Sequence, residues 1–317
     1  MTASGHSLSS KTHVDRTWLV AIAAALWGLD GLLREPLAVS INPATVVLWE
    51  HVIIVVILSP FILPAMRVFA RCSLRDKAAI VTIGVGASAV GTALFTQAFR
   101  LSAQTGDFIT PLILQKLQPI FAVLLAVVLL RERLKPGFAI YAVPALVGAW
   151  LMTFAQPFDV KIAALQSALF AVGAAVLWAS GTVLGRMVTA SVSPRDMTVL
   201  RFSFGVIGAI VVVAVVRAPV LPGWSNMPGL VLLALIPGLL GLGLYYLGLR
   251  YTAASRATFA EMAFPATAAV VGVLFLGTTL TWSQWVGFAI VVATITALGW
   301  RERVKPTVED PLLEKVI

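Results

Sequence analysis

The sequence predicts an all-α, polytopic membrane protein of ten transmembrane helices, arranged as two inverted repeats of five helices each. Three observations predict this fold: the composition, a series of long apolar runs and an internal duplication. Of the 317 residues, 59% are hydrophobic and only 12% are charged, and the mean hydropathy is +0.96. Soluble domains are about half apolar and about a quarter charged, so most of this chain must face lipid rather than water.

Ten apolar runs are long enough to cross a bilayer, for which a helix needs about 20 residues. The runs are continuously apolar and lack the period of two that is typical of a membrane β-barrel, which favours helices. The expected spans are residues 17–36, 44–66, 78–99, 108–130, 137–154, 163–184, 197–216, 228–249, 257–277 and 283–300. The first run contains Asp30 and lacks a small-residue cleavage site, so we expect an uncleaved span rather than a signal peptide.

Basic residues are distributed unevenly over the predicted loops. Of the 23 Lys and Arg residues, Lys116 and Arg201 fall within spans, and the outer side holds only Arg34, Arg100, Lys161 and Arg217. Basic loops stay in the cytoplasm, so this asymmetry predicts a multi-pass protein of the inner (plasma) membrane with both termini cytoplasmic. The same loops explain the net charge of +9, and no nucleic-acid partner is expected. The single cysteine, Cys72, lies in one of these loops and allows no disulfide framework.

Short segments recur about 150 residues apart. Gly137-Phe138-Ala139-Ile140 recurs as Gly287-Phe288-Ala289-Ile290, and further matches are Trp27 with Trp178, Arg100 with Arg250, Pro119 with Pro265 and Trp150 with Trp300. We therefore expect two repeats, over residues 17–155 and 162–301. Because each repeat holds an odd number of spans, the second enters the membrane from the opposite side, which is an architecture frequent among secondary transporters.

Several short segments also occur in a characteristic order. They are Leu26-Trp27-Gly28, Leu117–Ala122 followed by Leu130–Leu134, and, in the second half, Leu177-Trp178-Ala179 and Phe264-Pro265-Ala266. With the duplication, this order resembles the EamA-type branch of the drug/metabolite transporter superfamily, over residues 18–304. The resemblance implies ten helices in two inverted repeats, a central cavity and export of metabolites or amino acids.

The chain departs from the family pattern at three places, one of which is the segment Gln104–Gln115, which is longer than its counterpart. Glu50-His51 stand where the family often carries Arg in the second span, although Arg201 retains it in the seventh. The second half has Gly277–Leu280 where the first has Arg131–Leu134, so it lacks the acidic loop residue. These departures weaken any transfer of substrate identity.

Charged and aromatic side chains inside the spans are the candidate functional residues, because a charge at the bilayer centre costs about 2.5–3.5 kcal/mol on insertion scales. The residues expected to bind substrate are Trp27, Asp30, Gln115, Lys116, Gln118, Trp178, Tyr245 and Glu261. Glu50, His51 and Arg201 are expected to take part in coupling to a proton or in an ion pair. The alternatives are a structural ion pair of Lys116 with Asp30 or Glu50, core packing for Trp27 and Trp178, and an interfacial position for Tyr245.

Pro119 and Pro265 are expected to kink their helices. A proline inside a helix removes one hydrogen bond and clashes with the carbonyl four residues earlier. We therefore expect the carbonyls of Gln115 and Glu261 to be freed near mid-membrane, beside a cavity. A kink that only shapes the helix is the alternative.

The sequence gives little support to an enzyme. No His, Cys and carboxylate cluster has metal-ligand spacing, and there is no phosphate-binding glycine loop, so we expect no metal, no cofactor and no use of ATP. Ser180 with His51 as base is a weak candidate for an intramembrane protease. We expect a secondary transporter that exports amino acids or similar amphipathic compounds by alternating access, driven by a gradient such as protons. A broad-specificity drug exporter is the alternative, and the sequence makes no prediction of oligomeric state.

Overall fold

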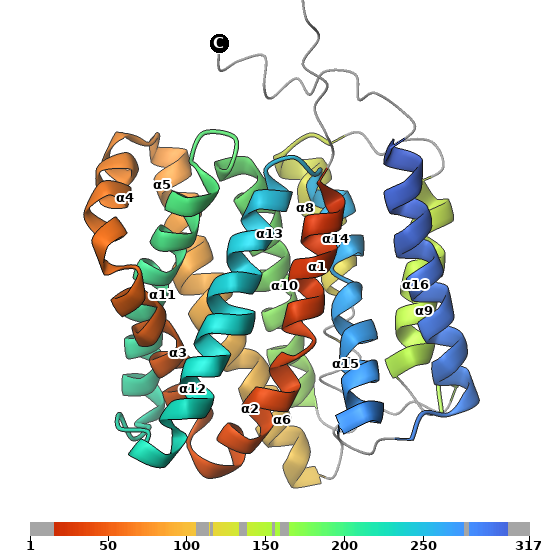
Figure 1. Cartoon of the computed structure of the whole chain (residues 1–317), viewed down its shortest axis with the longest axis horizontal. Helices are drawn as coiled ribbons and strands as arrows, with labels where there is room; N and C mark the ends of the chain where they lie inside the picture. Colours follow the sequence, from red (N-terminus) through yellow and green to blue (C-terminus); the bar gives the residue numbers. More distant parts are fainter. Residues whose placement is uncertain are drawn as a thin grey trace, which may run out of the picture.

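The chain folds into a bundle of helices (Figure 1), and a computed structural model describes residues 16–105, 114, 117–132, 138–153, 156–158, 165–275 and 279–303. Among these residues there is no β-strand. The helices are α1 (Thr17–Trp27), α2 (Asp30–Ser40), α3 (Pro43–Ile57), α4 (Ser59–Arg71), α5 (Leu74–Val81), η1 (Thr82–Val90), α6 (Gly91–Thr105), α8 (Gln118–Leu129), α9 (Phe138–Thr153), α10 (Leu165–Val188), α11 (Pro194–Val216), η2 (Trp224–Asn226), α12 (Met227–Leu233), η3 (Ala234–Gly241), α13 (Leu242–Leu249), α14 (Ala254–Ala260), α15 (Ala263–Phe275) and α16 (Trp282–Arg303). The expected all-α class is therefore correct for the part described.

The described helices make a multi-pass membrane protein. By length and composition, five helical stretches can cross a membrane: Thr17–Arg34, Leu74–Phe95, Leu165–Val188, Pro194–Val216 and Trp224–Leu249. The pair α3 and α4 is a sixth candidate, and α8, α9 and α16 contribute shorter apolar stretches. The prediction of ten spans thus stays a prediction.

The second predicted span, 44–66, is not one straight helix. The chain bends by 90° between α3 and α4. The cause is local, because Pro60 follows the break at Leu58 and has no N–H to offer the preceding turn. The hydropathy pattern alone continues through this break, which is why the sequence predicted a single span.

Two π-helical segments, η1 and η3, lie about 150 residues apart, at equivalent places in the two halves of the chain. The segment η1 packs against α10 and α11, and η3 packs against α1 and α3. Each half therefore sets its π-helix against the first two spans of the other half. A π-helix inside an α-helix often marks a functional site, and these two flank the cavity described below.

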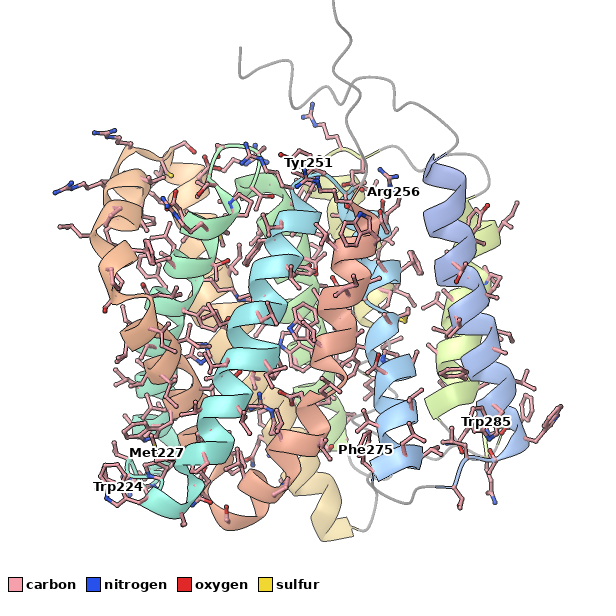
Figure 2. The ribbon with its side chains drawn as sticks, viewed as in Figure 1. Trp224, Met227, Tyr251, Arg256, Phe275 and Trp285 are labelled. Atoms are coloured by element: carbon pink, nitrogen blue, oxygen red, sulfur yellow. The ribbon has the colours of Figure 1, made fainter. Side chains whose placement is uncertain are left out.

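The two ends of the bundle carry different side chains. Tyr251 and Arg256 lie at the end where α1 begins and α16 ends, and Trp224 and Trp285 lie at the opposite end (Figure 2). Trp224 is 90% exposed. Aromatic residues at both ends are typical of a protein whose bundle axis crosses a bilayer.

Candidate functional site

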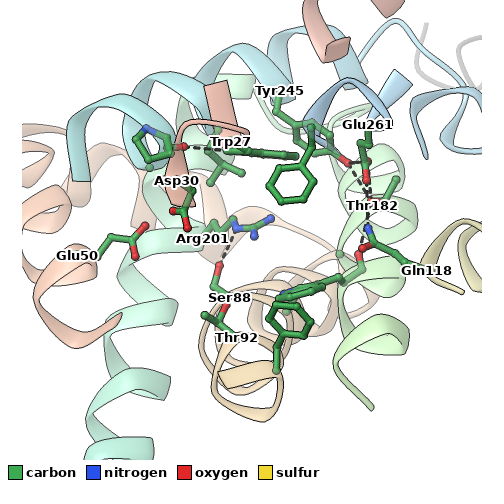
Figure 3. A pocket seen from close by; sticks show the side chains of 18 of the residues that line it. Trp27, Asp30, Glu50, Ser88, Thr92, Gln118, Thr182, Arg201, Tyr245 and Glu261 are labelled. Atoms are coloured by element: carbon green, nitrogen blue, oxygen red, sulfur yellow. Dashed lines mark hydrogen bonds between the residues drawn. The ribbon is translucent and has the colours of Figure 1, made fainter. Parts of the chain in front are cut away.

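A cavity of about 340 Å³ lies inside the bundle (Figure 3). The predicted site residues that line it are Trp27, Asp30, Glu50, His51, Gln118, Pro119, Trp178, Arg201, Tyr245, Glu261 and Pro265. Two further predicted residues, Gln115 and Lys116, lie outside the described residues. Side chains from both halves of the chain thus converge on one cavity, and their roles stay predictions.

Two aromatic pairs line this cavity. The ring centroids of Trp27 and Tyr245 lie 5.0 Å apart, and those of Trp178 and Phe95 lie 4.9 Å apart. Both separations are within the favourable range for offset or edge contacts between aromatic rings. The members of one pair lie about 150 positions from their counterparts in the other, so the pairs are related by the internal duplication. Phe95 was not among the predicted residues.

Each tryptophan packs against a glycine at the end of a π-helix. A Cβ atom on Gly241 would lie 2.9 Å from Nε1 of Trp27, and one on Gly91 would lie 3.1 Å from Nε1 of Trp178. A side chain at Gly241 would therefore displace the indole of Trp27, and one at Gly91 would require a small shift of the indole of Trp178. Trp27 is also held by a hydrogen bond from Nε1 to the carbonyl of Pro237, at 3.0 Å.

Glu261 lies at the break between α14 and α15 and is only 9% exposed. The hydroxyls of Tyr245 and Thr182 donate to its Oε1 at 2.8 and 3.1 Å, and the Gln118 amide donates to Oε2 at 3.1 Å (Figure 3). Gln118 comes from the first half of the chain and the other three from the second. Tyr245 is 2% exposed, so the alternative of an interfacial position is wrong for this residue.

Arg201 lies on the opposite side of the cavity from Glu261 (Figure 3). Its Nε donates to the Ser88 hydroxyl at 2.7 Å, and Nη1 donates to the Tyr246 hydroxyl at 3.0 Å. Both partners are neutral, and within the described part of the chain no carboxylate lies within ion-pair distance of Arg201.

Arg34, which was expected on the outer side and was not among the predicted site residues, lines the cavity from α2, which continues beyond it to Ser40. Its guanidinium bonds Asp30 at 2.6 and 2.8 Å and Glu50 at 2.9 Å. Asp30 and Glu50 are therefore compensated by Arg34, whereas the expected ion-pair partner, Lys116, lies outside the described residues. The sequence did contain an indication of the ion pair between Asp30 and Arg34, because residues four positions apart lie on the same face of a helix.

His51 and Ser180 do not form a nucleophile and base. Nδ1 of His51 lies 2.8 Å from the carbonyl of Val47, which can only accept, so the proton is on Nδ1. Among the described residues, Nε2 has no hydrogen-bond partner, and it is packed beside Gly205. Ser180 donates to the carbonyl of Val176 in its own helix, at 2.7 Å. The described geometry therefore gives no support to the protease alternative.

Pro119 and Pro265, which were expected to kink their helices, both stand close to a helix start. Pro119 is in the first turn of α8, and Pro265 is in the first turn of α15. Proline is tolerated there because a helix leaves its first N–H groups unbonded. The expected free carbonyl at Glu261 is not found, since it accepts from the N–H of Phe264 at 3.0 Å. The carbonyl of Gln115 lies outside the described residues.

Comparison with known protein families assigns the chain. The sequence pattern of the EamA-like transporter family matches residues 17–154 and 165–300, which is one match in each half. The chain belongs to the EamA-like transporter family. This confirms the resemblance seen in the sequence and indicates a membrane transporter rather than an enzyme.

Curated relatives of this EamA-like transporter carry transporter names. The riboflavin transporter ImpX of Fusobacterium nucleatum is 28% identical over 298 residues, which cover 90% of this chain and 98% of the relative. The uncharacterized transporter YwfM of Bacillus subtilis is 27% identical over 219 residues, covering 67% of this chain and 71% of the relative. A solved crystal structure shares the fold with a TM-score of 0.73 at 18% identity, over 91% of this chain and 98% of its own.

Proposed function

We propose that this EamA-like transporter is a secondary carrier that moves a small aromatic metabolite across the membrane by alternating access through the central cavity. The observation that carries the proposal is the pair of related aromatic contacts, Trp27 with Tyr245 and Trp178 with Phe95, on one cavity. Aromatic walls favour a planar ligand, and most small-molecule sites combine such walls with a few polar groups that fix orientation.

The first candidate substrate is riboflavin or a compound of its class. Its planar ring system fits between aromatic walls, and its carbonyls and hydroxyls match polar groups such as Arg201 and Gln118. The name of ImpX, a relative that aligns over 98% of its length, supports testing this substrate first.

The second candidate is an aromatic amino acid. Glu261 and Arg201 present opposite charges to the same cavity, and each has neutral partners among the described residues. A zwitterion would supply an ammonium group to one and a carboxylate to the other. A broad-specificity drug exporter would instead accept many unrelated cations at the carboxylate.

The two expected repeats, residues 17–155 and 162–301, support a mechanism of alternating access. Trp27 of the first packs against η3 of the second, and Trp178 of the second packs against Gly91, which follows η1 of the first. Rocking one set of helices against the other would open the cavity first to one side and then to the other. We propose cytoplasmic termini in the plasma membrane, as the basic loops predict, and outward transport, as the resemblance to the family implies.

Glu261 is the strongest candidate for coupling to protons. Asp30 and Glu50 share one bonded cation, Arg34, whereas Glu261 has only uncharged donors around it in the described structure. Transport by a Glu261→Gln variant should therefore lose its dependence on pH, while Asp30→Asn should keep it. A normal pH dependence in Glu261→Gln would contradict this assignment.

Thermal stability against a panel of compounds tests the substrate class. A ligand that binds only the folded state raises the melting temperature of the detergent-purified protein. We expect riboflavin, or failing that tryptophan, to raise it, and aliphatic amino acids and sugars to leave it unchanged. The shift should disappear in Trp178→Ala. A shift with many unrelated cationic drugs would favour the multidrug alternative, and a shift with aliphatic compounds only would contradict the proposal.

A further inference from the structure

Glu261 has a hydrogen-bonding position that the described side chains leave open. A carboxylate offers about four acceptor positions, two on each oxygen. Oε1 accepts from Tyr245 and Thr182, and Oε2 accepts from Gln118. Within the described part of the chain, no fourth donor contacts this carboxylate, and the residue lines the cavity (Figure 3).

The partner that fills this position must be a donor. An ionised carboxylate can only accept hydrogen bonds, and all three neighbours are placed as donors toward it. A buried acceptor that stays without a partner loses its solvation without compensation, so a ligand that supplies an N–H here is favoured over one that does not. Bonds to a charged acceptor are also stronger than those between neutral groups.

The two related sides of the cavity differ in polarity. Tyr245 carries a hydroxyl that bonds Glu261, whereas its counterpart Phe95 has none. Across the cavity, Arg201 uses Nε and Nη1 for Ser88 and Tyr246, and its remaining N–H groups can meet only acceptors. A ligand therefore fits in one orientation, with a donor toward Glu261 and an acceptor toward Arg201.

The geometry points to Glu261 as a specificity-determining residue, which selects ligands whose polar edge donates an N–H to Oε2. This inference rests on the proposed function, because it assumes that the central cavity is the substrate site. Riboflavin has one ring N–H, in the imide between two carbonyls, and an aromatic amino acid has its ammonium N–H groups. Both candidate classes therefore carry the required donor.

Two pairs of probes test the inference by equilibrium binding to the purified full-length protein. The first pair is riboflavin and 3-methylriboflavin, in which a methyl group replaces the imide hydrogen. The second pair is tryptophan and its N,N,N-trimethyl derivative, which keeps the charge but has no ammonium N–H. For whichever parent compound binds, we expect the methylated compound to bind at least about 10-fold more weakly, since sites built to bond a donor strongly reject analogues that lack it.

Two variants separate a hydrogen bond from simple crowding by the methyl group. Glu261→Gln keeps the side-chain volume but loses the charge, so the ratio of the two affinities should fall to within about 3-fold if a charge-assisted hydrogen bond sets it. Crowding would leave the ratio unchanged. Ser88→Ala, on the Arg201 side of the cavity, is the matched control. It should weaken the binding of both compounds by the same factor.

The outcomes distinguish the inference from the proposed function. Equal binding of a parent compound and its methylated form, or an unchanged ratio in Glu261→Gln, overturns the inference and leaves the aromatic carrier in place. Binding of neither riboflavin nor tryptophan overturns the proposed function and the inference with it.

Discussion

Glu132 accepts hydrogen bonds from the first residues of α14, although 122 positions separate it from Ala254. Its carboxylate receives the N–H of Ala254 at 2.8 Å, and the N–H and hydroxyl of Ser255 at 3.2 and 2.7 Å. The first half of the chain thus caps a short helix of the second half, and that helix ends directly before Glu261.

Removing this cap should destabilise the protein. Glu132→Ala leaves two backbone N–H groups without their acceptor, and losing a helix cap costs about 0.5–2 kcal/mol. We expect a lower melting temperature for Glu132→Ala, a smaller loss for Glu132→Gln, and the smallest for Ser255→Ala, which removes only the hydroxyl contact. Equal melting temperatures for all three variants and the parent protein would show that the cap contributes nothing.

The contact between Trp27 and Gly241 gives a second prediction. An added methyl group at Gly241 would lie 2.9 Å from the indole nitrogen, so Gly241→Ala should cost about 1–3 kcal/mol and displace the ring from the cavity wall. Gly243 is the matched control, because a Cβ there meets nothing within 4 Å. Replacing a helical glycine by alanine without a clash favours folding by about 0.5–1 kcal/mol. The two variants should therefore shift the melting temperature in opposite directions, and equal shifts would contradict the packing described.

Arg34 should matter more for stability than either of its partners. Arg34→Gln leaves two carboxylates, Asp30 and Glu50, facing each other without the cation that joins them. Breaking a buried ion pair by removing one partner costs about 3–5 kcal/mol, and the partial exposure of this cluster should place the loss near or below the lower value. Glu50→Gln removes a charge and keeps the Asp30 pair, so it should be milder. A Glu50→Gln variant that is as unstable as Arg34→Gln would contradict this order.

Some residues of the candidate site could be predicted from the sequence, and others could not. Glu261, Trp27 and Trp178 could be predicted because a charge or a large aromatic ring deep in an apolar run is unusual. Thr182 and Ser88 could not, since small hydroxyl residues are common in spans and only the fold brings them to Glu261 and Arg201. Arg34 was missed because it stands near the end of the first predicted span, where a basic residue is usual, and only the fold shows that its guanidinium bonds Asp30 and Glu50 beside the cavity.

The helix geometry was the harder part to predict. In a continuously apolar run, the spacing of side chains does not distinguish a π-helical segment from an α-helix. The segments η1 and η3 could therefore not be predicted from the sequence. Pro119 and Pro265 each stand in the first turn of a helix, and the kinks expected of them stay predictions. The duplication, by contrast, predicted which residues would be counterparts, because it depends only on order and spacing.

Cys72 tests the predicted orientation without any substitution, since it is the only cysteine in the chain. It lies between α4 and α5, in the loop expected to be cytoplasmic. Burial raises the pKa of its thiol, and Asp76 adds to this. Because the thiolate is the reactive form, labelling should be slow at neutral pH and accelerate as the pH rises past the ordinary range of a thiol.

A membrane-impermeant maleimide should label Cys72 in inside-out vesicles and leave it unlabelled in right-side-out vesicles. Cys72→Ser provides the background. Labelling from the outer side alone would reverse the predicted orientation.

Counterflow in proteoliposomes shows directly whether the cavity between the two repeats is the transport site. Vesicles loaded with unlabelled riboflavin or tryptophan should accumulate the same labelled compound when they contain the wild-type protein or Gly243→Ala. We expect Trp178→Ala and Glu261→Gln, reconstituted to equal amounts, to lose most of this exchange. Unchanged exchange in both cavity variants, or exchange of aliphatic compounds alone, would contradict this expectation.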